Sequence, residues 1–451
     1  MTAVMWFRRD LRLGDNPALL EACADGDVLP LFVLDPVLWG PSGPTRRAYL
    51  LRSLRALDAS LGGRLVVEEG PPAEVVARVA DRVGAGRVHV SADTGPYGRR
   101  RDDAVEEALR AADRTLVRTG TAYAVGPGSV LTGAGRPFQV FTPFSRAWAD
   151  HGWPRPADSP GAARWVRDGG EGVDGAHWPG EPDLGDLTLP EAGEDAARAR
   201  WHEFTEHALA DYDEDRNRPD HAGTSQLSAA LKWGEVHPRT LLADLAGQRS
   251  RGAEVFRTEL AWREFYADVL WHRPETAREY YRPQLAALRY QPPGPDFEAW
   301  SQGRTGFPVV DAGMRQMRAE GWIHNRVRMI TASFLVKDLH VEWQHGAREF
   351  MRWLRDGDLA SNNHGWQWVA GSGTDAAPFF RVFNPITQGQ KFDPSGDYVR
   401  RYVPELRHLG GKAVHEPWSA PDGYAHGYPQ RIVDHAHERQ VALDDYQRVK
   451  G

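Results

Sequence analysis

The fold is decided by two short apolar runs near the N-terminus, Val4-Met5-Trp6-Phe7 and Val28-Leu29-Pro30-Leu31-Phe32-Val33-Leu34. Runs of this length and apolarity are typical of buried strands. Between them, Asp15-Asn16-Pro17 predicts the start of a helix, because a capping residue precedes a proline in the first helical turn. The chain therefore begins with a strand, a helix and a second strand.

The same alternation continues outward from these runs to about residue 128. Amphipathic helices are expected at 45–61, 73–83 and 101–112, and strands at 65–67 and 88–90. Strands that alternate with helices of this length predict a doubly wound parallel sheet. No GxGxxG pattern follows the first strand, so the dinucleotide-binding fingerprint is absent. Both a bare scaffold and a site at the carboxyl ends of the strands remain open.

A change of composition separates this α/β domain, residues 1–128, from the rest. Residues 129–198 are rich in Gly, Pro and acidic side chains and have weak periodicity, which indicates an interdomain linker that runs over the surface. Residues 199–451 carry long helical patterns, so the second domain is expected to be all-α. Its expected helices are 203–210, 253–272, 309–320, 325–339 and 346–355.

The composition is that of a globular protein with two domains. The chain has 451 residues, of which 41% are hydrophobic and 26% charged, and no apolar run is long enough to span a membrane. No secretory signal is visible, and Cys23 is the single cysteine, which excludes a disulfide framework and a Cys-based metal cluster. A cytoplasmic location is expected. The net charge is −7, but nine acidic residues and no Lys or Arg fall in residues 168–195, so a basic face elsewhere is compatible with it.

Two segments of the helical domain are candidates for ligand binding. Residues 223–228 place small hydroxyl side chains before an apolar run, and a helix N-terminus of this kind can hold a phosphate, although an ordinary capped helix start is the commoner explanation. Farther on, Glu259, Trp262, Arg263 and Tyr266 share one helical face. That face suits a planar polar ligand, and equally a half-buried helix with internal ion pairs.

Two further segments complete the set. The apolar run 329–336 follows Arg326 and Arg328, so this helix carries arginine into the core, where it needs an acidic partner. Asp356 is the candidate partner of Arg328. Residues 356–368 hold two Asp, two Asn and two Trp, which is too dense for a neutral surface loop, although a Trp-rich corner of the core is the alternative.

Together these segments resemble the DNA photolyase/cryptochrome family. The resemblance rests on Trp6-Phe7-Arg8-Arg9-Asp10-Leu11-Arg12 and on segments 224–228, 259–266, 324–329 and 356–368, which match in order and spacing over nearly the whole chain. The sequence is most similar to class I photolyases of cyclobutane pyrimidine dimers. The resemblance implies a flavin enzyme, a deoxyribodipyrimidine photo-lyase, that repairs DNA with blue light by electron transfer from excited FADH⁻, ring splitting and electron return.

The resemblance also assigns a flavin site in the helical domain. Asn362 matches the residue that faces flavin N5, where Asn favours reduced flavin and plant cryptochromes carry Asp. The residues that match the FAD site are Tyr212, Thr224, Ser225, Gln226, Leu227, Ser228, Arg328, Asp356, Gly357, Asp358 and Asn362. No metal is implied.

A dimer pocket and a DNA face follow from the same resemblance. Trp262 and Trp368 would sandwich a flipped-out dimer, and Glu259 would hydrogen-bond to a base edge; with Asn362 these are the expected catalytic residues. The residues that match DNA contacts are Arg216, Glu259, Trp262, Arg263, Asn325, Arg326, Met329, Trp368, Gln388 and Lys391. The expected partner is DNA with a pyrimidine dimer, bound by a monomer that needs no protein partner.

The family reduces its flavin through three tryptophans, and here the pattern departs. Trp366 matches the first and Trp343 the second, but Tyr290 stands at the third position. A tyrosine usually loses its phenolic proton on oxidation, so an exposed Tyr with no base nearby would be a slower terminal donor. Tyr290 is favoured as the end of the path, with Trp300 or another nearby Trp as the alternative.

The α/β domain of the family binds an antenna chromophore. Arg46, Asp93, Arg99 and Lys232 match its contacts with a deazaflavin, 8-HDF, which is expected here ahead of FMN or methenyltetrahydrofolate. The alternatives for the whole chain are a cryptochrome-like photoreceptor, a photolyase of the (6-4) lesion that uses a histidine such as His324 or His364, and a non-photochemical nucleotide-binding protein.

Overall fold

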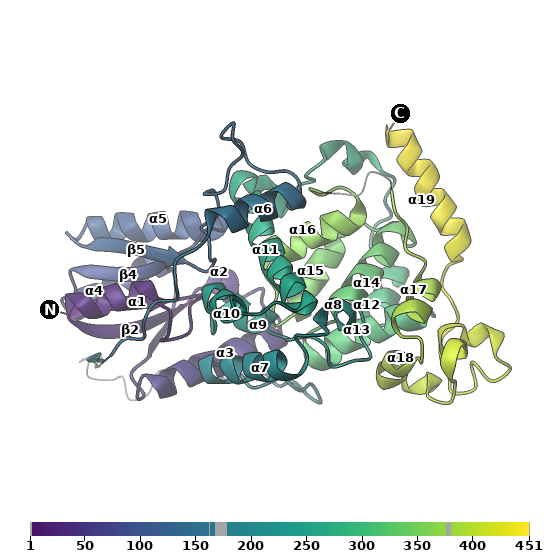
Figure 1. Cartoon of the computed structure of the whole chain (residues 1–451), viewed down its shortest axis with the longest axis horizontal. Coiled ribbons are helices and arrows are strands. Elements are labelled where there is room, and N and C mark those ends of the chain that lie inside the picture. The colour runs from purple at the N-terminus through teal and green to yellow at the C-terminus, as the bar shows by residue number, and fades with distance from the viewer. Residues whose placement is uncertain (1, 162, 167–177, 376–379, 451) are drawn as a thin grey trace.

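A parallel sheet of five strands forms one end of the molecule in the described part of the chain, in the order β3-β2-β1-β4-β5 (Figure 1). The computed structural model describes residues 2–161, 163–166, 178–375 and 380–450. The strands are β1 (Thr2–Phe7), β2 (Asp27–Leu34), β3 (Val66–Glu69), β4 (Arg87–Ala92) and β5 (Thr115–Thr121). Every neighbouring pair is parallel, as the alternation of strands and helices predicts.

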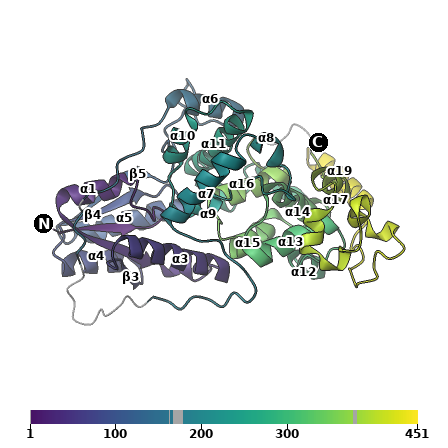
Figure 2. The same ribbon diagram turned by 60° about the horizontal axis from the view of Figure 1, so that its bottom comes forward.

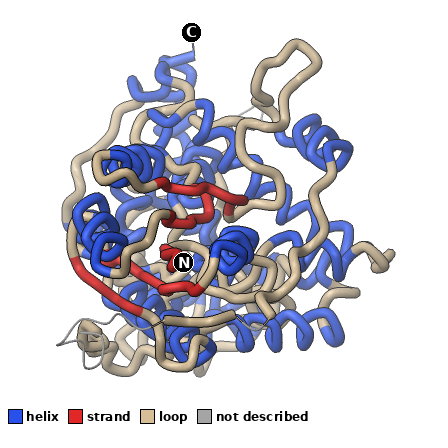
Figure 3. The backbone as a smooth tube through the Cα atoms, turned by 90° about the vertical axis from the view of Figure 1, so that its left-hand side faces the viewer, coloured by secondary structure: helices blue, strands red, loops and turns tan. Residues whose placement is uncertain are grey.

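Helices cover both faces of this sheet, because β1 alternates its side chains between two cores. Met5 and Phe7 lie in one apolar cluster with α1 (Pro17–Asp25) and α3 (Pro44–Ser60). Val4 and Trp6 lie in another with α4 (Pro72–Arg82) and α5 (Pro96–Arg110). Figure 3 shows the strands between these helices, seen from the sheet end. The doubly wound fold is confirmed; the sequence did not single out the short α2 (Pro36–Trp39) or the edge strand β5.

The segment expected to be linker, residues 129–198, contains regular structure. Helix α6 (Phe141–His151) lies within it, and α7 (Glu194–His207) begins in its last residues. Phe144 and Trp148 of α6 are buried in one cluster with Phe265, so this part belongs to the helical core. Residues 162 and 167–177, which include three of the acidic residues of the linker, lie outside the described residues.

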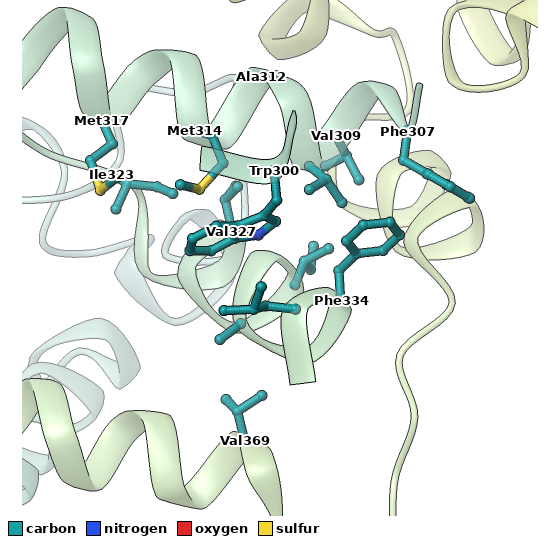
Figure 4. Packing of buried hydrophobic residues seen from close by; sticks show 14 of the residues in the cluster. Trp300, Phe307, Val309, Ala312, Met314, Met317, Ile323, Val327, Phe334 and Val369 are labelled. Atoms are coloured by element: carbon teal, nitrogen blue, oxygen red, sulfur yellow. The ribbon is translucent and has the colours of Figure 1, made fainter. Parts of the chain in front are cut away.

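The remaining elements are helices, as expected. They are α8 (Tyr212–Asp215), α9 (Ser228–Trp233), α10 (Pro238–Leu245), α11 (Arg251–His272), α12 (Pro295–Ser301), α13 (Pro308–Glu320), α14 (Asn325–Lys337), α15 (Trp343–Trp353), α16 (Leu359–Ala370), α17 (Pro385–Phe392), α18 (Asp397–Tyr402) and α19 (His435–Lys450), with five short 3₁₀ turns. The dense segment 356–368 is therefore largely helix α16. Trp300 of α12 sits in the core between α13 and α14, against side chains such as Met314 and Val327 (Figure 4).

The buried carboxylate of Glu235 connects the helical part of the molecule to α3 of the sheet domain. It accepts hydrogen bonds from Tyr49 Oη at 2.9 Å and Ser53 Oγ at 2.6 Å, both on α3, and from the Gly193 amide at 2.8 Å. The ion pair of Arg239 with Asp15, at 2.6 Å, is buried as well. Figure 2 shows α7 beside α3. The sheet domain and the helical part are therefore docked by buried polar contacts, and Asp15 Oδ1 also accepts from the Ala157 amide at 2.8 Å.

Candidate functional site

A cavity of about 1090 Å³ opens among α11, α14 and α16 and is closed by α8, α9, α15 and α17. It brings together two predicted groups of residues that are distant in sequence. From the expected flavin site it is lined by Tyr212, Ser225, Leu227, Ser228, Arg328, Asp356, Gly357, Asp358 and Asn362. From the expected dimer and DNA face it is lined by Arg216, Glu259, Trp262, Arg263, Asn325, Arg326, Met329, Trp368, Gln388 and Lys391.

The inner part of the cavity is built on the pair of Arg328 and Asp356. Arg328 Nη2 donates to Asp356 Oδ2 at 2.7 Å, which is the acidic partner expected for this half-buried arginine of α14. Burial by itself would raise the pKa of Asp356, but Arg328 and the Ser228 hydroxyl stabilise the carboxylate and the pKa is lowered. Its other oxygen, Oδ1, is buried and has no hydrogen-bond partner among the described residues, so it offers an acceptor to a ligand that brings an N–H or O–H group.

Asp358 caps α16 and ties the cavity to the sheet domain. Its Oδ1 accepts from the Ser361 amide at 3.0 Å, and its Oδ2 pairs with Arg9 Nη2 at 2.7 Å. Although burial opposes ionisation, Arg9, Lys232 and Arg263 hold the pKa of Asp358 far below its ordinary value. One turn on, Asn362 Nδ2 donates to the Ala347 carbonyl at 3.1 Å and to Asn363 Oδ1 at 2.8 Å, which fixes the amide.

The aromatic side of the cavity is supported by the segment that the sequence left as linker. The ring of Trp262 stacks on Phe141, the first residue of α6, with centroids 3.6 Å apart and planes within 7°. Phe141 is buried whereas Trp262 lines the cavity. Trp368, also in the lining, comes from α16. Two indoles from separate helices therefore face one space, which suits a flat apolar ligand with polar edges.

Glu259 lies on the same face of α11 and pairs with Arg216 at 2.7 Å. Burial is the largest influence on the pKa of Glu259 and raises it, against the lowering effect of Arg216 and Arg326. The carboxyl therefore takes up a proton more readily than an exposed Glu. Arg326 also donates to the Asn217 side chain. This part of the cavity is positively charged, because it is lined by Arg216, Arg326, Arg381 and Lys391.

Three predicted residues lie elsewhere. Thr224 and Gln226 are adjacent in sequence to the cavity but are not in its lining; Gln226 accepts instead from Arg355 Nη2 at 3.4 Å. Arg99 is exposed on α5, and its guanidinium stacks over the Trp271 ring at 4.1 Å. Since α9 begins only at Ser228 and has six residues, it offers less of a phosphate site than the hydroxyl pattern suggested.

The sequence also missed residues that line the cavity. Phe256 comes from α11, Phe350 from α15, and Arg381, Val382, Phe383 and Asn384 precede or cap α17. The Asn384-Pro385 pair was a visible signal, because an Asn before Pro marks a helix start and so a fixed segment. The apolar members carried no such signal, since core residues look the same in sequence.

The three residues of the expected electron path lie in one region. Trp366 lines the cavity and packs on Gly346, one turn after Trp343 in α15. Trp343 is fully buried, and Tyr290 is half-buried rather than exposed. The alternative donor, Trp300, contacts Trp366 edge-on at 6.1 Å but has no exposed surface.

A second, smaller cavity of about 130 Å³ lies at the carboxyl ends of the strands. Its lining includes Trp6, Trp39, Arg46, Asp93 and Lys232, so it collects three of the four expected antenna contacts and leaves out Arg99. Lys232 lines both cavities, and burial lowers its pKa to about 7. A drug-sized ligand generally needs about 300 Å³ or more, so a chromophore would enter this cavity only with movement of side chains.

The two histidines that kept the (6-4) alternative open are not in the lining of the large cavity. His364 is fully buried between Thr276 Oγ1 and the Ala360 carbonyl, at 2.9 and 2.8 Å. His324 caps α14. Burial lowers the pKa of His324 to about 3 and that of His364 to about 4, so both are neutral near pH 7.

The described residues contain no group of three His, Cys, Asp or Glu side chains placed to hold a metal ion. Within the same residues, no helix is long and apolar enough to cross a membrane.

Two family models and a set of curated relatives match this chain. A model of the FAD binding domain of DNA photolyase matches residues 256–448, and a DNA photolyase model matches residues 3–161. The deoxyribodipyrimidine photo-lyase of Streptomyces griseus is 42% identical over 461 residues, which cover 100% of this chain and 99% of the relative.

Two solved structures share the fold along the whole chain. A bacterial class III photolyase from Agrobacterium tumefaciens superimposes with a TM-score of 0.91 at 39% identity, over 100% of this chain and 98% of the other. The cryptochrome of Synechocystis sp. superimposes with a TM-score of 0.90 at 25% identity, over 98% of each chain. The identity to curated relatives, the two matched models and the shared fold show that this chain belongs to the DNA photolyase/cryptochrome family.

Proposed function

We propose that this chain is a deoxyribodipyrimidine photo-lyase, a flavoprotein that uses light to split cyclobutane pyrimidine dimers in DNA. The observation that carries the proposal is one continuous cavity with a polar inner part, around Arg328, Asp356 and Asn362, and an aromatic, basic part around Trp262 and Arg216. At about 1090 Å³ it exceeds the range of about 300–1000 Å³ that is usual for small ligands, so it has room for a cofactor and a substrate together.

The residues present fit FAD. The buried, unpaired Oδ1 of Asp356 requires a donor, and a flavin ring carries an N–H group beside its carbonyls. Arg328 supplies a donor on the same wall, and Asn362, whose Nδ2 already donates to Ala347 and Asn363, offers its Oδ1 as an acceptor. When bound in its reduced form, FAD would supply a light-driven electron to the dimer and recover it after the ring has opened.

The side chains of the outer part would bind and orient the dimer. Trp262, held flat by Phe141, and Trp368 would contact the two faces of the flipped-out pyrimidines. A damaged step costs less to unstack than an intact one, which favours the dimer over normal bases. Glu259, which pairs with Arg216, would hydrogen-bond to a base edge of the dimer. Arg326 and Lys391 would contact phosphates.

The (6-4) alternative loses support, because its reaction needs a histidine acid and neither His324 nor His364 lines the cavity. The fold does not separate the photoreceptor alternative or the photolyase classes, since a class III photolyase and a cryptochrome superimpose equally well. Asn362 is the residue that favours repair over signalling here.

An antenna at the smaller cavity is part of the proposal. Arg46, Asp93 and Lys232 would hold a deazaflavin, 8-HDF, which is proposed ahead of the alternatives FMN and methenyltetrahydrofolate. Reconstitution of the purified protein with each chromophore, followed by absorption of the bound fraction, tests the choice.

The activity is tested with the purified flavin-loaded protein and an oligonucleotide that contains one thymine dimer. Repair in blue light and none in the dark is expected. A parallel oligonucleotide with a (6-4) lesion should stay unrepaired. A protein that binds flavin but repairs neither lesion would contradict the proposal and favour the photoreceptor.

A further inference from the structure

Tyr280 lies between two residues of the expected electron path. Its ring centroid is 6.1 Å from that of Trp343 and 6.5 Å from that of Tyr290. Tyr280 is buried, whereas Tyr290 is half-buried. A chain of aromatic rings therefore runs from Trp343 outward through Tyr280 to Tyr290.

The backbone fixes this arrangement. The Gln291 amide donates to the His340 carbonyl at 2.7 Å, which joins the segment of Tyr290 to the start of α15. The Tyr281 amide donates to Gln367 Oε1 of α16 at 2.8 Å, and this holds its neighbour Tyr280 in place. The three rings thus belong to segments that are tied to one another near the ends of two helices.

The aromatic side chains of this path differ in whether they have a hydrogen-bond acceptor, which matters when they are oxidised. The indole nitrogens of Trp366 and Trp343 are buried and have no hydrogen-bond partner among the described residues. The Tyr280 hydroxyl, in contrast, donates to Glu342 Oε1 at 3.0 Å. An oxidised tryptophan here has no acceptor for its proton, so it remains a radical cation that can take an electron from the next ring. Tyr280 is the first position along the path where a proton can leave.

Burial, the Tyr290 hydroxyl and the Glu342 carboxylate all raise the pKa of Tyr280. The ring therefore stays protonated until it is oxidised. Burial likewise raises the pKa of Tyr290 to about 12. The phenolic proton of an oxidised tyrosine is strongly acidic compared with that of the neutral ring, so a nearby carboxylate becomes its natural acceptor.

We propose that Tyr280 relays electrons from Tyr290 to Trp343 and that Glu342 accepts the phenolic proton of Tyr280. The proposal rests on the proposed function, because the oxidant is a photoexcited flavin that takes an electron from Trp366. Trp366 is refilled from Trp343, and Trp343 from Tyr280, whose proton moves to the Glu342 carboxylate. Tyr290 then gives one electron and its proton to the Tyr280 radical, and a thiol in solution reduces the Tyr290 radical.

Trp300 does not supply an alternative exit. It contacts Trp366 at 6.1 Å, but it has no exposed surface and its indole N–H donates to the Thr331 carbonyl at 3.0 Å. A charge on Trp300 would therefore stay in the core, away from any reductant in solution.

The test compares the flavin-loaded parent with Tyr280→Phe, Glu342→Gln and the control Tyr281→Phe. Tyr281 has the same side chain one residue away, but its ring is covered by the Arg273 guanidinium at 4.5 Å. Each protein is illuminated with a thiol present, and electron spin resonance follows the tyrosyl radical. Infrared difference spectra follow the carboxylic acid band that appears when a carboxylate is protonated.

Tyr280→Phe should lose the tyrosyl signal and photoreduce more slowly, while Tyr281→Phe behaves as the parent. Glu342→Gln can still accept the hydrogen bond but takes no proton, so it should lose the light-induced acid band and the tyrosyl signal. Parental photoreduction and radical yield in Tyr280→Phe would overturn the relay and leave the proposed function intact. A parent that is not photoreduced at all would overturn both.

Discussion

At the residue scale, the Glu259 side chain has two roles. It is paired with Arg216 on one side and faces the proposed dimer space on the other. Glu259→Gln should lower the repair yield by about tenfold, equal to about 1.4 kcal/mol of transition-state stabilisation, and should change dimer binding less. Repair quantum yield and dimer affinity are measured on the same preparation.

The matched control is Glu254→Gln on the same helix, since that side chain is 54% exposed and pairs only with Arg251 among the described residues. It should repair as the parent does. Equal losses of binding and repair in Glu259→Gln would show that the carboxyl acts on affinity alone.

Asn362 supports a second prediction at this scale. Asn362→Asp replaces an amide that donates to the Ala347 carbonyl with a carboxylate that repels it and that disfavours added electron density nearby. The midpoint potential of the bound flavin should fall by about 30 mV or more, since 30 mV corresponds to about tenfold in a two-electron equilibrium. A redox titration of the two proteins measures it, and an unchanged potential would contradict the role of Asn362.

Single residues show how far the sequence alone could lead. The Arg328–Asp356 pair was predictable because an arginine that precedes an apolar helical run is expected to need a carboxylate partner. Tyr280 was not, because its importance comes from the position of its ring between Trp343 and Tyr290, which no sequence pattern encodes. Arg99 was misplaced since a motif match gives the helix, α5, but not the direction of an exposed side chain.

At the scale of elements, α6 is a helix whose first residue supports the site. Phe141→Ala would remove the ring behind Trp262 and leave a space in a buried cluster. We expect dimer affinity to fall, flavin content to stay the same, and the protein to lose about 3–5 kcal/mol of stability. Phe138→Ala, in the half-buried side chain that precedes α6, is the control and should retain affinity. Parental dimer binding by Phe141→Ala would contradict this support.

The end of α14 provides a pH-dependent prediction. Burial lowers the pKa of Lys337 to about 7 from the ordinary 10.5. Between these values the unfolded chain binds more protons than the folded one, so the contribution of Lys337 to stability rises with pH, by about 1.4 kcal/mol per unit.

Lys337→Met removes this dependence. The stability of the variant relative to the parent should therefore be higher at pH 6 than at pH 9. Urea unfolding midpoints of both proteins at the two pH values measure this difference. The exposed Lys412→Met is the control and should show no such difference. An identical change of midpoint at pH 6 and pH 9 for Lys337→Met would count against a buried, displaced charge.

Elements with strong periodicity were predictable, and those with mixed composition were not. The strands β1 and β2 and the helices α11, α13 and α14 follow from their apolar patterns to within a few residues. Helix α6 was hidden because it lies among Gly, Pro and acidic residues, although its apolar side packs on α11. Helix α16 was hidden because its polar residues either line the cavity, as Asn362 does, or are buried, as His364 and Gln367 are.

At the scale of the whole molecule, the net charge of −7 conceals a basic region at the cavity. DNA affinity should fall with salt because phosphate contacts release counterions. Lys391→Ala should reduce the slope of log affinity against log salt by about 1 and weaken binding equally for different flanking sequences. Lys412→Ala, exposed and far along the chain, should leave the slope unchanged. A parental slope in Lys391→Ala would remove this residue from the DNA face.

The buried joint around Glu235 has a consequence for handling the protein. Tyr49, Ser53 and the Asp15–Arg239 pair fasten the sheet domain to the helices directly, and these contacts remain available when the connecting segment is cut. A chain opened at the exposed Gly185 would yield two fragments able to reassemble when mixed. Each fragment alone would lack one wall of the joint, so recovery of bound flavin would report their reunion. The architecture thus lends itself to a split, light-responsive reporter.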